Sequence, residues 1–511
     1  MDPRTHTTHR KVQASVVGGL ALLLSATACA DDPGVDREGR GAADTGSWDG
    51  ALEWEPCGGG EGAECGTLTV PVDWDDPDGA TVDLSLTRHT AEDPDERIGP
   101  LLYLAGGPGD PGALHVRFMP ELFGERVREQ FDLVGLDPRG VNDSGAVVCS
   151  EDLLDAEPDA YLHSQEDFDE RVEYNRALRE DCREHTGPLY DHVDTLSVAH
   201  DVDAVRAAMG EERITAYGTS YGTAVGALYA EQYPDRVRAM ALDGLVDRNA
   251  DTEDFVGLRV ESMQAAFDAF VDWCADEGSC ALHGQSVPEI WADLLERADA
   301  DGLEGQEGPL TSYELVEQVH ECAYEPDWAG LADHLAALGS GQVAEGTACG
   351  GDEEDAGPPV EIQDSRGLSV ANFCSDYDLA VDDHEGWHDL MERTGDEHGP
   401  DVGLSPNAVQ RIADCLGGHH PATRPQHGQE TDREAPILLT STVADPITGH
   451  NQAARVAEQL GDRASLLTYE GAGHGAYGFF SGSECVTEAV DDFLVTASPP
   501  EDGTTCPDAR G

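Results

Sequence analysis

Basic residues are scarce in this chain of 511 amino acids. It has 30 lysines and arginines against 103 aspartates and glutamates, a formal net charge of −73, and its only lysine is Lys11. Binding to nucleic acid needs a basic surface that faces the phosphates, and charge-driven binding to anionic lipid needs one too. We therefore expect no nucleic-acid partner and no membrane contact through surface charge. The acidity fits either a well-solvated extracellular surface or adaptation to high salt, where screening weakens self-repulsion.

The N-terminal region contains an apolar stretch that is too short to span a membrane. Residues 16–24 follow the basic residues Arg4, Arg10 and Lys11. A basic segment, a short apolar segment and then small residues together predict a cleaved export signal over residues 1–28.

The residue after this signal predicts a lipid anchor. Small residues at 25–28 lead to Cys29, and this arrangement resembles the lipobox of bacterial lipoproteins, in which the cysteine is lipid-modified. Simple secretion is the alternative. Residues 29–50 are rich in Asp, Gly and Ala and predict a flexible tether. We expect the protein outside the cytoplasm, secreted or held at the cell envelope, with any membrane contact made by this anchor.

The cysteines agree with export. Without Cys29, the 13 cysteines become an even set of 12, as expected in an oxidising compartment. Short spacings predict three disulfides: Cys57–Cys65, Cys274–Cys280 and Cys485–Cys506. Pairing among the other six remains open: Cys149, Cys182, Cys322, Cys349, Cys374 and Cys415. The sequence has no paired Cys-x-x-Cys spacing that would indicate a zinc site, and nothing in it calls for a metal or an organic cofactor.

Short apolar runs predict a mostly parallel sheet with helices on both faces. Alternating residues at 67–72 and 81–86 predict edge strands, and continuous apolar runs predict buried strands at 100–104, 131–136, 214–217 and 237–242. Residues 248–430 have a helical pattern, and strands resume at 435–440 and 465–469. The expected domains are a first core segment at 51–247, a helical cap at 248–430, a second core segment at 431–498, and a tail at 499–511 that is loose unless Cys506 holds it.

Residues 218–222 have the pattern Gly-x-Ser-x-Gly, which is typical of a nucleophile elbow. The apolar run at 214–217 precedes them and a helix-like run at 224–230 follows. A strand–turn–helix of this kind lifts the Ser220 hydroxyl out of the sheet, and the helix N-terminus beneath it favours developing negative charge. Ser220 is therefore the predicted nucleophile, and the alternative is a tight Gly/Ser turn without chemistry.

A serine hydroxyl needs a base to take its proton, and the base needs an acid to orient it. His474 lies in a glycine-rich turn beyond a predicted strand, and Asp445 ends the strand before it. The chain order Ser, Asp, His is that of α/β-hydrolases. We expect His474 as base and Asp445 as orienting acid, with Asp414 and Asp462 as alternatives to Asp445.

Backbone N–H groups must stabilise the oxyanion that this chemistry forms. One is predicted at Tyr221, directly after the nucleophile. The other should come from the glycine-rich loop at 105–112. Pro108 has no N–H, and by position we favour Gly107.

Several motifs together resemble the secreted tripeptidyl aminopeptidases of actinobacteria, which belong with the proline iminopeptidases among α/β-hydrolase serine peptidases. They extend over residues 50–495 and are found at 106–109, 137–140 with Ser144, 218–223, 233–237, 242–244 and 373–376. The resemblance implies an α/β-hydrolase fold with an inserted helical cap, and the roles given above for Ser220, Asp445 and His474. It implies an architectural turn at 137–140, locked by Arg139.

The chain departs from this family at two places. Asp110-Pro111 replaces the usual Gly-Ser after Gly-Gly-Pro-Gly, and residues 447–449 read Ile-Thr-Gly where Val-Thr-Pro is more typical. The first change borders the oxyanion loop and could alter substrate entry.

The resemblance implies an exported exopeptidase that releases short peptides, perhaps tripeptides, from free N-termini of peptides or proteins, and we expect a monomer. An esterase or lipase, or a peptide-binding envelope lipoprotein without activity, are the alternatives. The substrate amine needs a carboxylate partner. Candidates, each of which could instead be a solvated or structural acid, are Asp243, Glu253, Asp254 and Asp376.

Overall fold

The structure of the chain is a computed structural model. It describes residues 52–58, 62–300, 302–305, 308–342, 349, 364–418, 426–429 and 437–509. Contacts divide the chain into Met1–Gly41 and Ala42–Gly511, and all described residues belong to the second unit. The predicted export signal, Cys29 and the tether at 29–50 lie outside the described residues.

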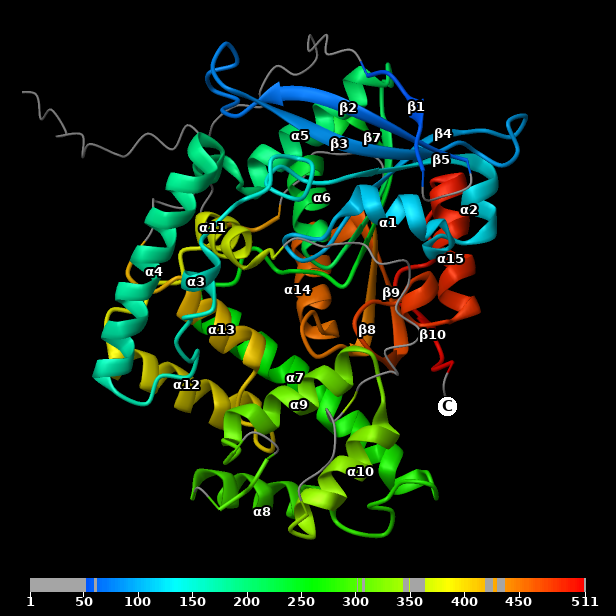
Figure 1. The fold of residues 1–511 in the computed structure, drawn as a ribbon. Coiled ribbons are helices and arrows are strands. Elements are labelled where there is room, and N and C mark those ends of the chain that lie inside the picture. The colour runs from blue at the N-terminus through cyan, green and yellow to red at the C-terminus, as the bar shows by residue number, and fades with distance from the viewer. Residues whose placement is uncertain are drawn as a thin grey trace, which may run out of the picture. The chain divides into compact units, whose positions relative to one another are not determined.

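A ten-stranded sheet forms the centre of the described part of the chain (Figure 1). Its spatial order is β1-β2-β3-β5-β4-β6-β7-β8-β9-β10. The first three strands pair antiparallel and β3 joins β5 antiparallel, whereas every pair from β5 to β10 is parallel. The strands are β1 (Glu55–Pro56), β2 (Ala63–Pro71), β3 (Thr81–His89), β4 (Gly99–Leu104), β5 (Phe131–Leu136), β6 (Ile214–Thr219), β7 (Val237–Asp243), β8 (Ile437–Ala444), β9 (Ala464–Ala472) and β10 (Thr504–Cys506).

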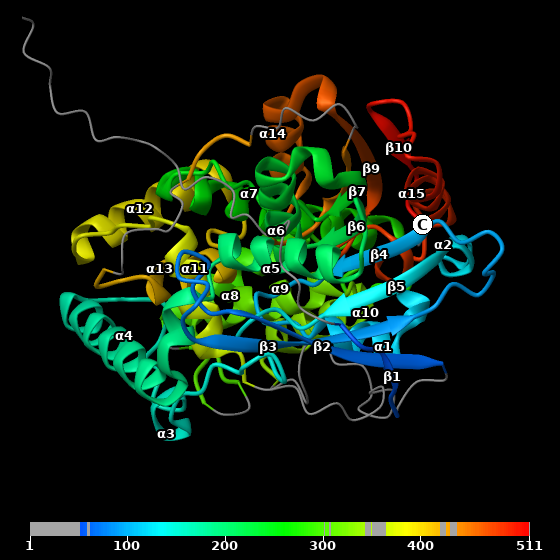
Figure 2. The same cartoon turned by 90° about the horizontal axis from the view of Figure 1, so that it is seen from above.

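Helices cover both faces of this sheet, as expected (Figures 1 and 2). Successive side chains of a strand point to opposite faces, so Leu102 and Leu104 of β4 join one buried cluster while Leu101 and Tyr103 join another. The first cluster includes α5 (Thr195–Ala208), α6 (Tyr221–Gln232) and α14 (His450–Leu460). The second includes α1 (Gly112–Phe118), α2 (Glu125–Gln130) and α15 (Glu484–Thr496).

A long helical insertion separates β7 from β8. Its helices are α7 (Thr252–Asp276), α8 (Val287–Asp299), α9 (Ser312–Tyr324), α10 (Trp328–Gly339), α11 (Arg366–Asp376), α12 (His384–His398) and α13 (Pro406–Asp414). The C-terminal half of α7 packs with α8, α9 and α10 in a cluster of its own, whereas α11, α12 and α13 share the cluster of the sheet. In Figure 1 the first group lies below the sheet. Only part of the insertion therefore has a separate core.

The remaining elements are short or peripheral. Helices α3 (Glu151–Leu154) and α4 (Gln165–Thr186) lie between β5 and β6, and 3₁₀ turns occur at Pro120–Leu122, Gly187–His192, Pro234–Arg236, Gly461–Arg463 and Gly478–Phe480. Among the residues described, none of the helices combines the length and apolar composition that a bilayer crossing requires.

Six disulfides link the described residues. The three pairs predicted from short spacing are confirmed: Cys57–Cys65, Cys274–Cys280 and Cys485–Cys506. The other pairs are Cys149–Cys182, Cys322–Cys349 and Cys374–Cys415. Cys506 lies in β10, which pairs with β9, so the segment after Ser498 is held to the sheet and is not a loose tail.

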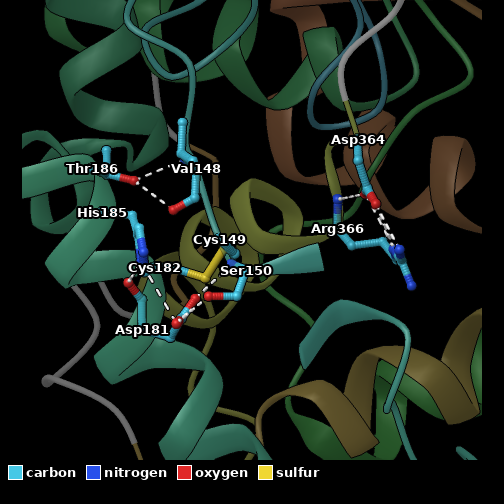
Figure 3. Close-up of a disulfide and its surroundings, with 9 residues drawn as sticks. All are labelled: Val148, Cys149, Ser150, Asp181, Cys182, His185, Thr186, Asp364 and Arg366. Carbon is cyan, nitrogen blue, oxygen red and sulfur yellow. Dashed lines mark hydrogen bonds and ion pairs between the residues drawn. A yellow bond between two sulfur atoms is a disulfide. The ribbon is translucent and has the colours of Figure 1, made fainter. Parts of the chain in front are cut away.

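The Cys149–Cys182 disulfide fastens the segment after β5 to helix α4 (Figure 3). Beside it, Ser150 donates its N–H and its hydroxyl to the two carboxylate oxygens of Asp181, at 2.7 and 2.6 Å. One turn further along α4, the Thr186 hydroxyl accepts a hydrogen bond from Val148 N. The disulfide is thus one of several contacts that fix this segment against α4.

Arg139 locks the turn at 137–140. Its side chain and that of Asp201 are fully buried, and the guanidinium binds both carboxylate oxygens, at 2.6 and 2.5 Å. Its remaining donors reach the carbonyls of Pro71, Val72 and His192. Arg139 therefore ties β2, the turn after β5 and the segment before α5 to one point.

Removing one partner of such a buried pair leaves the other charge without compensation. We expect Arg139→Met to lower the free energy of unfolding by about 3–5 kcal/mol, measured by chemical denaturation with the disulfides intact. Arg393→Met is the control, because Arg393 and Glu253 form an exposed pair whose loss should cost below about 1 kcal/mol. Equal losses in the two variants would contradict the structural role of Arg139.

Candidate active site

Ser220 stands at a sharp turn between β6 and α6. Strand β6 ends at Thr219 and helix α6 begins at Tyr221, so Ser220 is the single residue between them. Its backbone has φ 53° and ψ −124°, a conformation that costs free energy for a residue with a side chain. Its N–H donates to the carbonyl of Asp243 at 2.9 Å, and Thr223 donates its N–H and hydroxyl to the Ser220 carbonyl. The surrounding bonds hold the strained turn in place, as a nucleophile elbow requires.

The glycines on either side of Ser220 allow the close packing of this turn. A Cβ on Gly222 would lie 2.0 Å from the carbonyl oxygen of Leu104, and one on Gly218 would lie 2.7 Å from the carbonyl oxygen of Gly222. Neither distance is possible for a real Cβ, so the approach of α6 to β4 explains Gly222, and the tightness of the turn itself explains Gly218.

Asp445 and His474 meet beyond the ends of β8 and β9. Both side chains are buried, and His474 Nδ1 lies 2.9 Å from Asp445 Oδ2. Because a carboxylate only accepts, Nδ1 carries the hydrogen and Nε2 is left to accept a proton. The other carboxylate oxygen, Oδ1, accepts the N–H groups of Ile447 and Thr448, both at 2.8 Å.

The two alternatives to Asp445 are engaged or located elsewhere. Asp414 binds Arg171 and Gln410 at the end of α13. Asp462 is exposed in a 3₁₀ turn.

Thr448 is a further member of this group that the sequence analysis did not single out. Its hydroxyl donates to Asp445 Oδ2 at 2.8 Å and lies 3.2 Å from His474 Nδ1. It thus contacts both members of the pair and restricts their orientation. Its spacing from Asp445 could have identified Thr448 from the sequence, because a Ser or Thr three residues after an Asp in a loop can hydrogen-bond back to the carboxylate.

Ser220 and His474 face a common neighbour, the Asp243–Gly244 segment. The carbonyl of Asp243 accepts the Ser220 N–H, and a Cβ on Gly244 would lie 3.7 Å from His474 Cε1 and 3.8 Å from Asp445 Oδ2. The three predicted residues are thus gathered at the carboxyl ends of β6, β8 and β9, where α/β sheets place ligands.

The cap reaches the histidine through helix α9. The carbonyl of Tyr324 accepts the backbone N–H of His474 at 2.9 Å, and the Tyr324 and His474 rings lie 4.8 Å apart. Tyr324 is 41% exposed, so part of its ring remains open beside the imidazole.

The glycine-rich loop after β4 lies against the nucleophile. A Cβ on Gly106 would lie 3.2 Å from Ser220 Cβ and 3.5 Å from the Thr219 carbonyl oxygen. The next residue, Gly107, has φ +102°, which favours glycine. The loop that holds Gly107 therefore adjoins Ser220, and Tyr221 follows Ser220 directly at the start of α6.

Comparison with known proteins agrees with these features. The profile described as "alpha/beta hydrolase fold" matches residues 99–295, and the one described as "TAP-like protein" matches residues 402–506. Serine protease Hip1 of Mycobacterium tuberculosis is 30% identical over 496 residues, covering 89% of this chain and 91% of that protein. The chain belongs to the α/β-hydrolase serine peptidase family.

Other relatives in this family have different names. Tripeptidyl aminopeptidase of Streptomyces coelicolor is 26% identical, covering 92% of this chain and 89% of that protein. Carboxylesterase B of M. tuberculosis is 29% identical, with coverages of 87% and 86%. Among solved structures, a proline iminopeptidase from Mycobacterium smegmatis covers 84% of this chain and 98% of its own, with 16% identity and a TM-score of 0.34. The predicted α/β-hydrolase fold and the resemblance to tripeptidyl aminopeptidases are confirmed.

Each of the four carboxylates suggested for the substrate amine already has partners in the structure. Asp243 is buried and accepts bonds from the Tyr217 hydroxyl and from Ala476 N and Tyr477 N. Glu253 pairs with Arg393, and Asp254 pairs with Arg455. Asp376 accepts both the N–H and the hydroxyl of Thr195, and burial raises the pKa of Asp376 to about 6.

Charges around His474 favour its protonated form. Burial lowers the pKa of His474, but Asp445, Asp243 and Asp110 together raise it above the ordinary 6.5. His474 conversely lowers the pKa of Asp445, against the effect of burial. His320 on α9 faces the same pair, and burial lowers its own pKa to about 4, so it is neutral near pH 7.

A base must be deprotonated to accept a proton, so activity should fall as His474 becomes protonated. We expect kcat/KM to rise with pH through an apparent pKa above 6.5, because the carboxylates hold the imidazolium proton to higher pH. A pH profile measures this, and NMR titration of the imidazole in Ser220→Ala assigns the group. A midpoint below 6.5 would contradict the electrostatic account.

The position of Thr448 predicts that its hydroxyl supports catalysis through the histidine pair. Thr448→Val should lower kcat about tenfold with little change in KM, since a hydrogen bond to a charged group is lost. Thr448→Ser should restore most of the rate because it restores the hydroxyl. Thr496→Val is the control, as its exposed hydroxyl at the end of α15 bonds only to the Asp492 carbonyl and the Ser498 N–H. A normal kcat in Thr448→Val would show that Asp445 needs no help from this residue.

Proposed function

We propose that the protein is an exported serine exopeptidase that releases tripeptides from free N-termini of peptides or proteins. The observation that carries this proposal is the buried bond of His474 to Asp445 beside the strained turn at Ser220. The family supports the reaction class, and the relative named tripeptidyl aminopeptidase supports the substrate class.

In the proposed mechanism, His474 Nε2 takes the proton of the Ser220 hydroxyl as its oxygen attacks the scissile carbonyl. The N–H groups of Tyr221 and Gly107 stabilise the oxyanion. His474 then gives its proton to the leaving amine, which leaves an acyl-enzyme. Water attacks that ester, with His474 again as base, and Ser220 regains its proton when the peptide leaves.

Asp445 acts on His474 rather than on the substrate. It fixes the tautomer with hydrogen on Nδ1 and stabilises the imidazolium that forms in each step. Because backbone N–H groups hold its second oxygen, the carboxylate cannot rotate away from the ring without losing those bonds.

Export is part of the proposal. The six disulfides suit an oxidising compartment, and the residues before the core carry the sequence pattern of an export signal over residues 1–28, followed directly by Cys29. We propose lipid attachment at Cys29, with release into the medium as the alternative.

The relative named carboxylesterase B keeps an esterase as the second candidate. Peptides with free and with acetylated N-termini, together with p-nitrophenyl esters, separate the two. We expect free-N-terminal peptides to be cleaved after the third residue, identified by mass spectrometry, and acetylation to slow cleavage. Ser220→Ala should abolish turnover while the protein stays folded. Preference for acetylated peptides or simple esters would defeat the exopeptidase assignment.

A further inference from the structure

Asp110 lies beside the nucleophile, in the loop between β4 and α1. A Cβ on Gly106 would lie 3.0 Å from Asp110 Oδ2 and 3.2 Å from Ser220 Cβ. The carboxylate and the serine side chain therefore flank the same point of the loop.

The Asp110 carboxylate has no hydrogen bond or ion pair to another side chain among the residues that the structure describes. It is partly buried, and burial raises its pKa, while His115 on α1 and His474 act in the opposite direction. Burial and, to a smaller extent, the charge of Asp110 raise the pKa of Tyr103 and of Tyr324. A carboxylate withdrawn from water without a partner is unfavourable, and a cation placed there would remove that cost.

A cavity of about 440 Å³ adjoins this carboxylate, and Gly107, Pro108 and Asp110 form one side of it. Three arginines line its other side. Arg171 binds Glu157 and Asp414, Arg366 binds Asp364, and Arg411 binds Ser369 and approaches Asp414. The basic groups of the cavity are therefore already paired with acids, whereas Asp110 forms no ion pair among the described residues and has only the charge interactions with His115 and His474.

We propose that Asp110 binds a cationic group on the substrate residue whose carbonyl Ser220 attacks. This proposal rests on the proposed function, and it adds the kind of substrate side chain that is preferred next to the bond that Ser220 cleaves. An extended chain advances about 3.3 Å per residue, so the α-amine of a tripeptide lies roughly 9 Å from its last carbonyl. That is too far for a carboxylate flanking Ser220. The side chain of a lysine or arginine next to the scissile bond is flexible enough to fold back toward Ser220, so the cation is that side chain.

The experiment compares fluorogenic Ala-Ala-Arg and Ala-Ala-citrulline amides, which differ in charge but little in shape. For the wild-type protein we expect kcat/KM for arginine to exceed that for citrulline about tenfold or more, the effect of one charged hydrogen bond. Asp110→Asn should reduce the ratio to near one. Glu253→Gln, which removes an exposed carboxylate elsewhere, should leave it unchanged. Labelling of Ser220 by a fluorophosphonate shows that each variant is folded and reactive.

Two results would overturn the proposal: a ratio near one in the wild-type protein, or a high ratio that persists in Asp110→Asn. A second pair of substrates, alanine amide with free and acetylated amine, tests the other source of a cation. If Asp110→Asn selectively slows the free amine, Asp110 binds the α-amine of a single residue and the side-chain proposal is wrong. If no amide is cleaved but the corresponding esters are, the exopeptidase proposal fails, and the arginine and citrulline esters still measure the selection by charge.

Discussion

Asp243 connects the two halves of the candidate active site, the Ser220 turn through its backbone carbonyl and the His474 loop through its buried carboxylate. Its backbone carbonyl accepts the N–H of Ser220, and its side chain accepts the N–H groups of Ala476 and Tyr477, just after His474. The Thr440 hydroxyl of β8 also donates to it, at 2.6 Å. One residue at the end of β7 therefore fixes the nucleophile turn, the neighbouring strand and the histidine loop against each other. Because β6, β7, β8 and β9 are adjacent and parallel, their carboxyl ends lie side by side. Asp243 can therefore contact residues at the ends of all three neighbouring strands.

Helix α9 of the cap contacts the candidate site at His474. The carbonyl of Tyr324, the last residue of α9, accepts a hydrogen bond from the backbone N–H of His474. Pro326 occupies the space that a side chain on Gly473 would need. Cys322 on the same helix is disulfide-bonded to Cys349. Helix α7 begins in the cluster of the sheet and ends in that of the cap, so it connects the two cores through one rigid element. The position of α9 over His474 therefore depends on the packing of the whole insertion.

Local pattern was enough to predict most of the central sheet. The apolar runs at 100–104, 131–136 and 237–242 coincide with β4, β5 and β7 within a residue. A buried parallel strand is continuously apolar because both of its faces are covered, and this signal is hard to mistake. The short disulfides followed from chain proximity alone. Cys149–Cys182, Cys322–Cys349 and Cys374–Cys415 could not be predicted, since each depends on how helices pack.

Sequence motifs led to the proposed triad but not to the other residues of the candidate site. Ser220, Asp445 and His474 stand at turns that the sequence marks with glycine or a strand end, and the structure gathers them at one edge of the sheet. The contacts of Thr448 with Asp445 and His474, and the position of Asp110 beside Ser220, depend on distances that no motif encodes. Asp243 illustrates the limit most clearly. Its sequence context allowed an amine anchor, but burial and four neutral donors leave it no room for a ligand.

The candidate active site is anionic, as is the chain as a whole. Its buried carboxylates are stabilised in two ways. Away from the site, Asp201 and Asp203 are paired with arginines. At the site, Asp243 and Asp445 are held by N–H and O–H groups that carry no net charge. A cation there would repel the imidazolium of His474 and lower its pKa. Neutral donors satisfy the carboxylates without that effect, so Asp243 and Asp445 continue to raise the pKa of His474.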